Sequence, residues 1–305
     1  VPGTGLIWGG YTLAGKSWFD GLLLAMSTVS TGGFTSGADE FADPSVQWGA
    51  IGGMLLAGSS MVTFWHLFVG RGGLHRQTGL SMYLGLNAAG VLLLVLWSTG
   101  VDLAAARRLL FVVAASVSTT GFPMDVPSEW STAAPVLLLL LVSVGAMSGS
   151  AGGGLQIRQH RALMKMALRE MARQLHPRAV LKVRLDRRVA GEDTLRQIVV
   201  LQFLFVAVTF STAFVVAVFG LDLAASISAA VHATATAGPV RGLDGVMVDP
   251  TEWPRSVRLA LLPAMVFGRL SIYPAVVAVV SLLSLLRDKA RVSRRYRAHR
   301  HGGSL

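Results

Sequence analysis

Long apolar runs are the feature of this 305-residue sequence that most restricts its fold. Five runs are long enough to cross a roughly 30 Å hydrocarbon core as helices of about 20 residues, if the third is followed past a Gly-rich break. They lie near 46–69, 79–97, 133–147, 195–219 and 257–286. Hydrophobic residues make up 52% of the chain and charged residues only 14%, a balance outside the range of soluble domains. The sequence therefore predicts an all-α integral membrane protein.

Charge placement predicts the orientation of these runs. The connectors 71–76, 158–196 and 287–300 are strongly basic, and the connectors between them carry acids. Because cytoplasmic loops are enriched in Lys and Arg, we expect a multi-pass protein of the cell (inner or plasma) membrane with the basic connectors and the C-terminus in the cytoplasm. The net charge of +11 then reflects topology, and no nucleic-acid partner is expected. The acids of the outer connectors are Asp39, Glu40 and Asp43, then Asp125 and Glu129, then Asp244, Asp249 and Glu252.

A repeated turn follows three apolar segments that are too short to span. The segments 18–29, 103–117 and 223–234 are predicted to be re-entrant helices on the outer side. The same order of a short helix, a turn, an acidic loop and a long span thus occurs three times. This internal repeat is the strongest pattern in the chain. The three turns are Ser30-Thr31-Gly32-Gly33-Phe34, Ser118-Thr119-Thr120-Gly121-Phe122 and the looser Thr234-Ala235-Thr236-Ala237-Gly238-Pro239.

The residue types of these turns suit a cation pathway. Non-helical backbone at membrane depth is tolerated only where it is buried in protein or lines a water-filled cavity. Gly permits a positive φ, with which successive carbonyl oxygens can face one axis and replace the hydration shell of a cation. Phe34 or Phe122 would hold the turn in place, and each short helix would direct its carbonyl end at the cavity. Close helix packing through small residues explains one such turn equally well, but three at equivalent places favour a pore.

These turns resemble the second, third and fourth pore repeats of the Trk/Ktr/HKT potassium transporters. Four such repeats surround one pore with pseudo-fourfold symmetry in that family. The resemblance covers nearly the whole chain and implies a pore-forming subunit of a potassium uptake system, not an enzyme, with K⁺ as transported ion and no tightly bound cofactor. Further matching segments are Gly149-Ser150-Ala151-Gly152-Gly153-Gly154, Leu175-His176-Pro177-Arg178-Ala179-Val180 and Gly268-Arg269-Leu270.

The resemblance also implies which residues form the selectivity filter. The glycine before each aromatic position belongs to it, which selects Gly33, Gly121 and, in the looser turn, Gly238. Backbone carbonyls would hold K⁺ at Thr31, Gly32, Gly33, Thr120, Gly121 and Gly238. The wider ion-binding set adds Ser30, Thr119, Thr236 and Ala237.

The repeats predict three units. Residues 1–70 would be a partial second repeat with pore helix, filter and second span, residues 71–175 the third repeat, and residues 176–305 the fourth repeat with a basic cytoplasmic tail. The first repeat and the first span of the second are not seen, so we expect an N-terminally incomplete protein that does not conduct by itself. The sequence leaves open whether the protein prefers K⁺ over Na⁺. It also leaves open whether the ion passes as through a channel or by coupled transport.

A Gly-rich break at 147–154 interrupts the third apolar run. Its glycine density disfavours a continuous helix, although a simple kink is an alternative. By the resemblance it is an intramembrane loop below the filter that moves on gating. Arg269 lies within the last run, where a charge is expensive unless it faces a polar cavity, and the resemblance implies an electrostatic barrier beside the loop; snorkelling is the alternative. The gate residues are then Gly149, Ser150, Gly152, Gly153, Gly154 and Arg269.

Basic residues after the break share one side of a predicted cytoplasmic helix. They would face solvent or phospholipid, or dock a nucleotide-binding regulatory ring of the TrkA/KtrA type, as the resemblance implies. The implied assembly is a homodimer in membrane lipid. The basic residues are Arg158, Arg161, Lys165, Arg169 and Arg173.

Departures from the family pattern leave a second reading open. Gln156 stands where Lys is usual, Ser271 where Glu is usual, and Arg241 lies close to the looser fourth turn. A positive charge at the mouth of a selectivity filter repels cations and so lowers their rate of entry. A weakly conducting or non-conducting member of the family is therefore an alternative.

Two other function classes fit the sequence less well than a pore does. A cation-coupled secondary transporter would place acidic residues at mid-membrane, and the runs carry almost none. An intramembrane hydrolase could use Ser148 or Ser150 with His160 or His66, but a nucleophile needs its base within hydrogen-bond reach. His160 lies beyond the break among arginines, which disfavours this reading.

Overall fold

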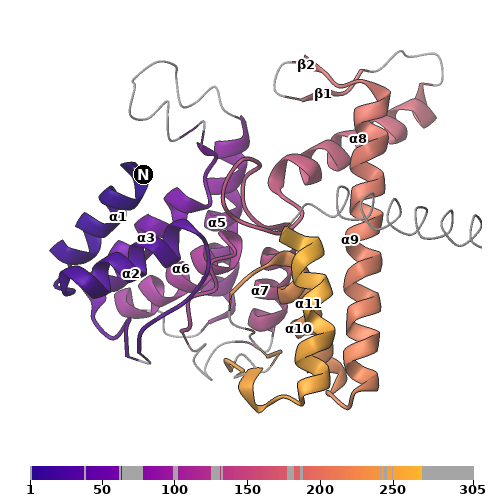
Figure 1. Cartoon of the computed structure of the whole chain (residues 1–305). Coiled ribbons are helices and arrows are strands. Elements are labelled where there is room, and N and C mark those ends of the chain that lie inside the picture. The colour runs from indigo at the N-terminus through magenta and orange to yellow at the C-terminus, as the bar shows by residue number, and fades with distance from the viewer. Residues whose placement is uncertain are drawn as a thin grey trace, which may run out of the picture.

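The computed structural model of the chain is almost entirely helical in its described residues (Figure 1). A single antiparallel hairpin of two-residue strands, β1 (Arg184–Leu185) and β2 (Arg188–Val189), is the only sheet among them. The predicted all-α class is confirmed. The structure describes residues 2–37, 39–61, 63, 78–98, 102–124, 131, 133–176, 182–185, 188–238, 240, 242–243, 246–248 and 250–269.

Three short helices begin and end where local sequence chemistry places them. They are α2 (Trp18–Val29), α6 (Leu103–Val117) and α10 (Leu223–Ala235), and they agree with the predicted re-entrant segments. Each begins at a side-chain cap, because Ser17, Asp102 and Asp222 accept a hydrogen bond from a backbone N–H of the first turn. Each ends at a Ser/Thr-containing turn. The remaining elements are α1 (Pro2–Leu13), α3 (Pro44–Ala57), α5 (Thr78–Trp97), α7 (Ala133–Val144), α8 (Ile157–Leu175), α9 (Glu192–Val218), the 3-10 turn η2 (Pro250–Glu252) and α11 (Arg255–Arg269).

Nine of the ten described α-helices form three groups of three, each with one short helix between two flanking helices, and α8 lies outside these groups. Contacts join α1, α2 and α3 to one another, likewise α5, α6 and α7, and likewise α9, α10 and α11, while α3 meets α6 and α7 meets α10. The sequence predicted no helix before Trp18, yet α1 packs on α2 through Tyr11, which is fully buried and bonds Thr28 at 2.9 Å. Helix α1 thus supplies the first flanking helix of the first group.

Among the described residues, two helical segments, Gly79–Trp97 and Glu192–Val218, are long and apolar enough to cross a membrane. Only 22% and 17% of their apolar windows are buried, which leaves most of both surfaces available to lipid. The predicted run 46–69 is not one helix, since α3 ends at Ala57 and Gly58–Ser60 is non-helical. A side chain at Gly58 would collide with the Tyr83 hydroxyl, so helix packing enforces a small residue at this break. The part of the last run beyond Arg269 lies outside the described residues.

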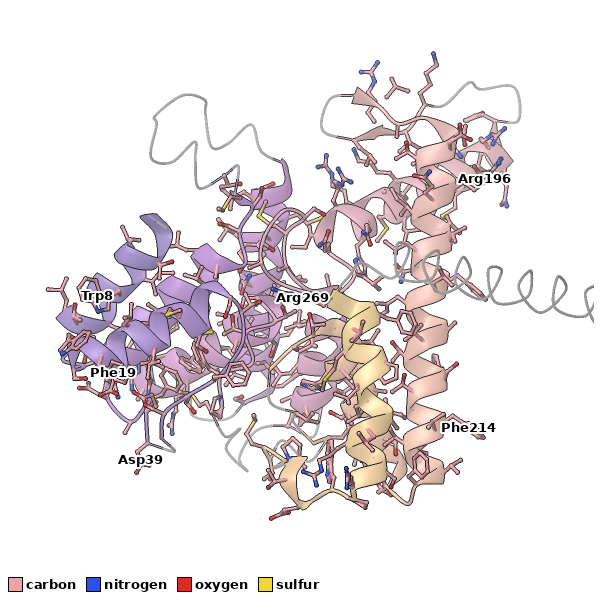
Figure 2. The ribbon with its side chains drawn as sticks, in the orientation of Figure 1. Trp8, Phe19, Asp39, Arg196, Phe214 and Arg269 are labelled. Atoms are coloured by element: carbon pink, nitrogen blue, oxygen red, sulfur yellow. The ribbon has the colours of Figure 1, made fainter. Side chains whose placement is uncertain are left out.

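Asp39 and Arg196 lie at opposite ends of the bundle along the direction of α9 (Figure 2). Figure 2 shows Asp39 at one end and Arg196 at the other, with Phe214 on the side of Asp39. The hairpin and the far end of α8 lie with Arg196 (Figure 1). The orientation of these two ends in the membrane stays a prediction.

Candidate ion pathway and gate

The three predicted turns share one unusual backbone conformation. Thr31, Thr119 and Thr236 have φ of 53°, 58° and 49°, in the left-handed region that β-branched residues rarely adopt. Each donates its backbone N–H to the carbonyl three residues earlier at 3.1 Å, which closes the helix end. Sequence reasoning assigned positive φ to the glycines instead. That assignment holds at Gly33 and Gly121 (71° and 68°) but is wrong for the third turn, where Thr236 takes this conformation and Gly238 does not.

The second and third turns meet backbone to backbone. A Cβ added at Gly121 would lie 2.7 Å from the nitrogen and 2.8 Å from the Cα of Gly238, closer than side-chain carbons approach. Gly238 in turn abuts the carbonyl oxygen of Thr120. Only glycine permits this approach. Two of the predicted filter glycines are therefore neighbours in space although they lie far apart in sequence.

The aromatic residues after the first and second turns have opposite environments. Phe122 is 1% exposed and its ring packs at a tilt against Phe41, with ring centroids 4.8 Å apart; Phe41 also contacts Phe111 edge to face at 4.9 Å. Phe34 is 78% exposed. Both were expected to hold a turn in place, and Phe122 is buried as that role requires. No described segment covers the ring of Phe34 as Phe41 covers that of Phe122, so the role of Phe34 stays a prediction.

The Gly-rich loop between α7 and α8 contacts all three turns at once. The Gly153 N–H donates to Thr119 Oγ1 at 2.7 Å, and the Gly154 N–H donates to the Ala235 carbonyl at 2.9 Å. Thr31 Oγ1 lies 3.1 Å from the Ala151 carbonyl oxygen. The loop therefore occupies the point at which the carbonyl ends of α2, α6 and α10 converge, where a cation would be favoured by the helix dipoles.

The same loop pairs with the break after α3. The Met61 N–H donates to the Gly149 carbonyl and the Met147 N–H donates to the Gly58 carbonyl, both at 3.0 Å. The backbone groups at these two helix interruptions thus form hydrogen bonds with each other at one level of the bundle. Buried non-helical backbone requires such partners. Sequence analysis missed this second break. The small residues Gly58, Ser59 and Ser60 inside an apolar run were the pattern that could have revealed it.

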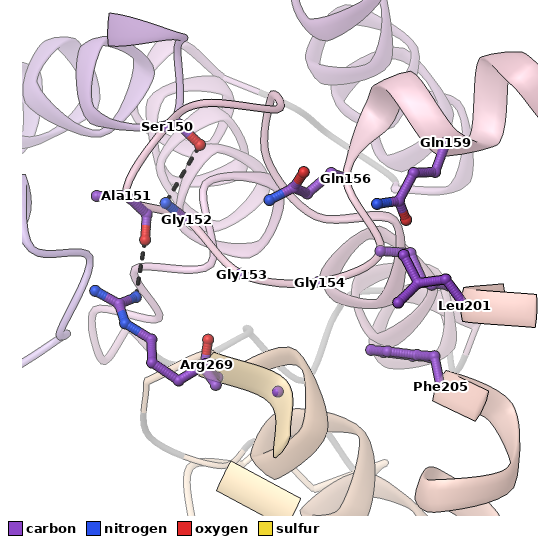
Figure 3. A pocket seen from close by; sticks show the side chains of 13 residues that line it. Ser150, Ala151, Gly152, Gly153, Gly154, Gln156, Gln159, Leu201, Phe205 and Arg269 are labelled. Atoms are coloured by element: carbon purple, nitrogen blue, oxygen red, sulfur yellow. Dashed lines mark hydrogen bonds between the residues drawn. The ribbon is translucent and has the colours of Figure 1, made fainter. Parts of the chain in front are cut away.

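Arg269 reaches the loop from the end of α11 (Figure 3). Its Nη1 donates to the Ala151 carbonyl at 2.9 Å. A cavity of about 290 Å³ lies beside this contact, between the loop, the start of α8 and α9, and Gln156, Gln159 and Thr236 are among its lining residues. The guanidinium thus places a full positive charge against the backbone of the Gly-rich loop.

Comparison with known proteins agrees with this geometry. Residues 99–285 match the family described as TrkH, cation transport protein. This chain belongs to the TrkH family. It is 28% identical over 284 residues to the Trk system potassium uptake protein TrkI of Halomonas elongata, covering 89% of this chain and 57% of that protein. It is 27% identical over 274 residues to the Trk system potassium uptake protein TrkH of Escherichia coli K12, covering 87% and 56%.

The fold also matches a solved member of the TrkH family. The crystal structure of the potassium transporter TrkH from Vibrio parahaemolyticus superposes with a TM-score of 0.82 at 22% identity, covering 90% of this chain and 61% of that chain. The sequence-based resemblance is therefore confirmed, and the chain is a membrane protein. It spans a little over half the length of the two relatives named above.

A strained residue joins the loop to α8 in this TrkH-family chain. Gln156 has φ 64° and ψ 138°, a region that residues with a Cβ avoid. Next to it the Ile157 N–H donates to the Ala146 carbonyl at 3.1 Å, so the start of α8 is bonded back to the start of the loop.

Thr236 Oγ1 is buried without a hydrogen-bond partner among the described residues.

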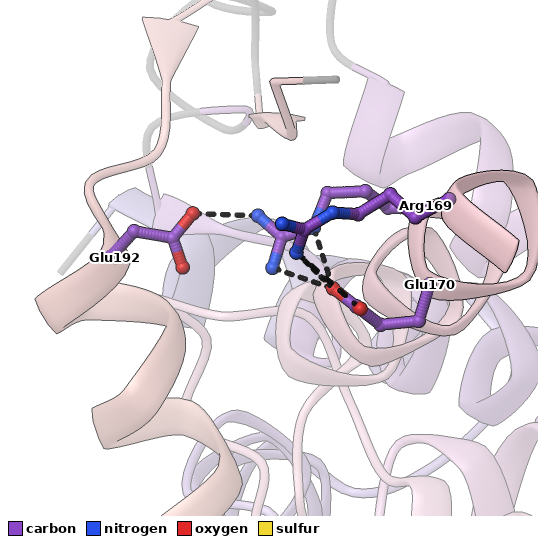
Figure 4. Close-up of polar contacts among 4 residues, drawn as sticks. Arg169, Glu170 and Glu192 are labelled. Atoms are coloured by element: carbon purple, nitrogen blue, oxygen red, sulfur yellow. Dashed lines mark hydrogen bonds and ion pairs between the residues drawn. The ribbon is translucent and has the colours of Figure 1, made fainter. Parts of the chain in front are cut away.

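Part of the predicted basic stripe on α8 is engaged within the chain (Figure 4). Arg169 pairs with Glu192 at 2.7 Å and with Glu170 at 3.1 Å, and Lys165 Nζ donates to the Arg184 carbonyl at 2.7 Å. The hydrogen bond to Glu192 raises the pKa of Arg169 above its ordinary value. These two basic side chains thus tie α8 to the hairpin and to the first turn of α9, and are not free as the sequence suggested.

The hydrolase constellation is not assembled in the described residues. Ser150 Oγ donates to the Met147 carbonyl at 2.6 Å, and His160 Nδ1 lies 3.3 Å from the Gln156 carbonyl. The buried Ser148 hydroxyl has no hydrogen-bond partner in this part of the chain, and His66 lies outside it. In this part of the chain Ser150 bonds a carbonyl and Ser148 bonds nothing, so neither predicted nucleophile has the histidine base that this chemistry requires.

Proposed function

We propose that this chain forms part of the pore of a potassium uptake system, in which the loop at 147–154 is the gate. The observation that supports this most directly is that the loop bonds to turns from three helices through Ala151, Gly153 and Gly154. A segment held at the convergence of three carbonyl ends controls whether a cation can pass. The relatives are named as potassium uptake proteins, which favours K⁺ as the ion.

Potassium is proposed to bind to backbone oxygens of the turns. The proposed ligands are the carbonyls of residues 31–33, 120–121 and 238. Carbonyl oxygens replace the hydration shell of K⁺ without a carboxylate, and the described residues contain no cluster of three His, Cys, Asp or Glu side chains suited to a metal ion. The backbone approach of Gly121 to Gly238 supports a shared axis for these two turns. No enzymatic activity is proposed.

The described arrangement corresponds to a closed gate in this proposal. Passage would require the loop to release Thr119 Oγ1 and the Ala235 carbonyl, and Arg269 to leave the Ala151 carbonyl. Each of these bonds contributes on the order of 1 kcal/mol, and more where an ion takes part. The relatives are named as proteins of a Trk system, which favours an assembly with further components. The proposed assembly is a homodimer in lipid with a cytoplasmic nucleotide-binding ring that acts on this loop.

Rubidium uptake tests this function. The protein in the form its gene encodes is expressed in bacteria deprived of their own potassium uptake systems, and ⁸⁶Rb⁺ entry is measured with K⁺ or Na⁺ as competitor. We expect uptake that K⁺ suppresses, and its loss in Gly121→Ala. Gly85→Ala is the matched control, since a Cβ at Gly85 meets nothing within 4 Å. Absence of uptake at normal membrane abundance, or normal uptake by Gly121→Ala, would overturn the proposal.

A further inference from the structure

We infer that α8 lies in the cytoplasmic interface of the membrane, with an apolar stripe against acyl chains and basic side chains on anionic phospholipid headgroups. This inference concerns a surface outside the ion pathway and does not rest on the proposed transport function. It rests on the exposure, placement and charge of a single helix, taken in turn.

The stripe consists of four large apolar residues on one face of α8. Met164 is 64% exposed, Leu168 57%, Met171 63% and Leu175 78%. Their spacing of four, three and four residues puts them on one side of the helix. Only Ile157 and Ala162, near the start of α8, are buried. In water such a stripe would be unfavourable, so something apolar must cover it.

The polar contacts of α8 fix the depth at which this stripe lies. Arg169 pairs with Glu192, the first residue of α9, and Lys165 bonds the Arg184 carbonyl of the hairpin. Because α9 is long enough to span the membrane, its first turn marks the membrane boundary. Helix α8 passes obliquely across this end of α9 instead of running beside it (Figure 1). A helix in that position runs at the level of the headgroups, with its stripe within reach of the acyl chains.

The charge of α8 selects lipid over a second copy of the chain. The helix carries five basic residues and one acidic residue, which leaves it with a net positive charge. Lys165, Arg169 and Arg173 also have contacts within the chain, and Arg158 is exposed. Two copies paired along this stripe would bring like charges together, which is unfavourable. An anionic leaflet attracts the same charges, and an amphipathic helix with Lys and Arg beside a Met/Leu face is typical of membrane-surface binding.

This placement has a consequence for the loop. Helix α8 begins one residue after the strained Gln156 and is bonded to Ala146 at the start of the loop. A lipid-held α8 would therefore fix the cytoplasmic end of the loop relative to the bilayer. The lipid surface becomes part of what keeps the loop in its described position.

Spin-label accessibility tests the inference in the intact protein. The chain contains no cysteine, so Leu168→Cys and the control Gln174→Cys, exposed on another face of α8, can each carry one nitroxide. The variants are reconstituted in phosphatidylcholine vesicles with or without phosphatidylglycerol. We expect the ratio of O₂ to nickel-chelate collision rates to be severalfold higher at 168 than at 174. We also expect phosphatidylglycerol to raise the ratio at 168, and this rise to disappear when Arg158 and Arg161 are both replaced by Gln.

Three outcomes would overturn the inference. The first is ready access of the nickel chelate to position 168, which means that the stripe faces water. The second is protection of 168 from both reagents together with dipolar broadening between labels, which means that a second copy covers it. The third is protection of 168 from both reagents without broadening, which means that another protein segment covers it. Normal rubidium uptake in any of these cases would leave the proposed function intact.

Discussion

Arg269 and Ala151 are 118 positions apart in sequence, yet Nη1 of the arginine donates to the carbonyl oxygen of the alanine at 2.9 Å. Within the described residues this carbonyl also lies 3.1 Å from Thr31 Oγ1. One oxygen therefore links the end of α11, the Gly-rich loop and the first turn. The contact explains how a charge inside an apolar run is accommodated, since the guanidinium faces the polar loop.

Removal of this guanidinium is expected to open the gate. Arg269→Ala eliminates a charged hydrogen bond worth about 1.5–3 kcal/mol and the repulsion of an incoming cation, so rubidium leak should rise roughly tenfold or more. Leak is measured as ⁸⁶Rb⁺ flux in proteoliposomes. Arg258→Ala, on the exposed surface of the same helix, should leave the flux unchanged. Equal flux in wild type and Arg269→Ala would contradict the barrier role.

Loss of the Thr119 hydroxyl is expected to loosen the loop. Thr119→Val keeps the shape of the side chain but leaves the Gly153 N–H without its acceptor, which costs about 1–3 kcal/mol where the donor is buried. Hydrogen exchange of the loop amides should become faster in this variant, while Thr119→Ser should retain protection. Unchanged exchange in Thr119→Val would mean that the bond does not hold the loop.

A methyl group at Gly153 is expected to displace the Gly-rich loop from its contacts with the third turn. The added Cβ would collide with the backbone carbonyl of Ala235 and with the side-chain Oγ1 of Thr236, both in the third turn. Gly153→Ala should therefore alter rubidium flux and lower the melting temperature in detergent. Gly52→Ala is the control, because nothing lies within 4 Å of a Cβ there. Similar behaviour of the two variants would contradict a close-fitting loop.

The two aromatic residues after the turns should respond differently to truncation. Phe122→Ala removes a buried ring that packs against Phe41 and is expected to destabilise the protein by about 3–5 kcal/mol. Phe34→Ala removes an exposed ring and should change stability by about 0.5 kcal/mol or less. Denaturation in mixed micelles measures both. A large loss for Phe34→Ala would mean that its ring is covered in the membrane.

The ion pair of Lys16 and Glu40 should set the acid sensitivity of the segment between α2 and α3. Lys16 Nζ lies 2.7 Å from Glu40 Oε1, and Ser36 Oγ donates to Oε2 at 2.6 Å. Burial raises the pKa of Glu40, but the hydrogen bonds from Lys16 and Ser36 outweigh it and hold the pKa below its ordinary value. The stabilisation is therefore complete above about pH 4.3 and is lost as the pH falls through the lowered pKa.

Replacement of Lys16 reverses this dependence. Lys16→Met leaves a buried carboxylate without its cation, so the variant should lose about 1.5–3 kcal/mol at pH 7 and recover part of it as Glu40 takes up a proton on acidification. Lys16→Arg should behave as wild type. Melting temperatures between pH 7 and pH 4 give the comparison, and parallel curves for wild type and Lys16→Met would refute the assignment.

The sequence by itself determined the short helices and the turns after them. Helix α6 begins at the Asp102 cap and ends at Ser118 because capping and turn chemistry act over a few residues. The Gly-rich break at 147–154 and the unusual position of Arg269 were likewise predictable, since the cost of irregular backbone or charge in an apolar run depends on the run itself. The division into units at 1–70, 71–175 and 176–305 stays a prediction.

Only the tertiary structure decided which of these features meet. The break at Gly58, the left-handed Thr236, the burial of Phe122 with exposure of Phe34, and the bond from Arg269 to Ala151 all depend on segments distant in sequence. Such contacts depend on how whole helix surfaces pack against one another. A local sequence pattern therefore does not predict them. Short-range hydrogen bonds therefore made the elements predictable, and long-range packing determined the site.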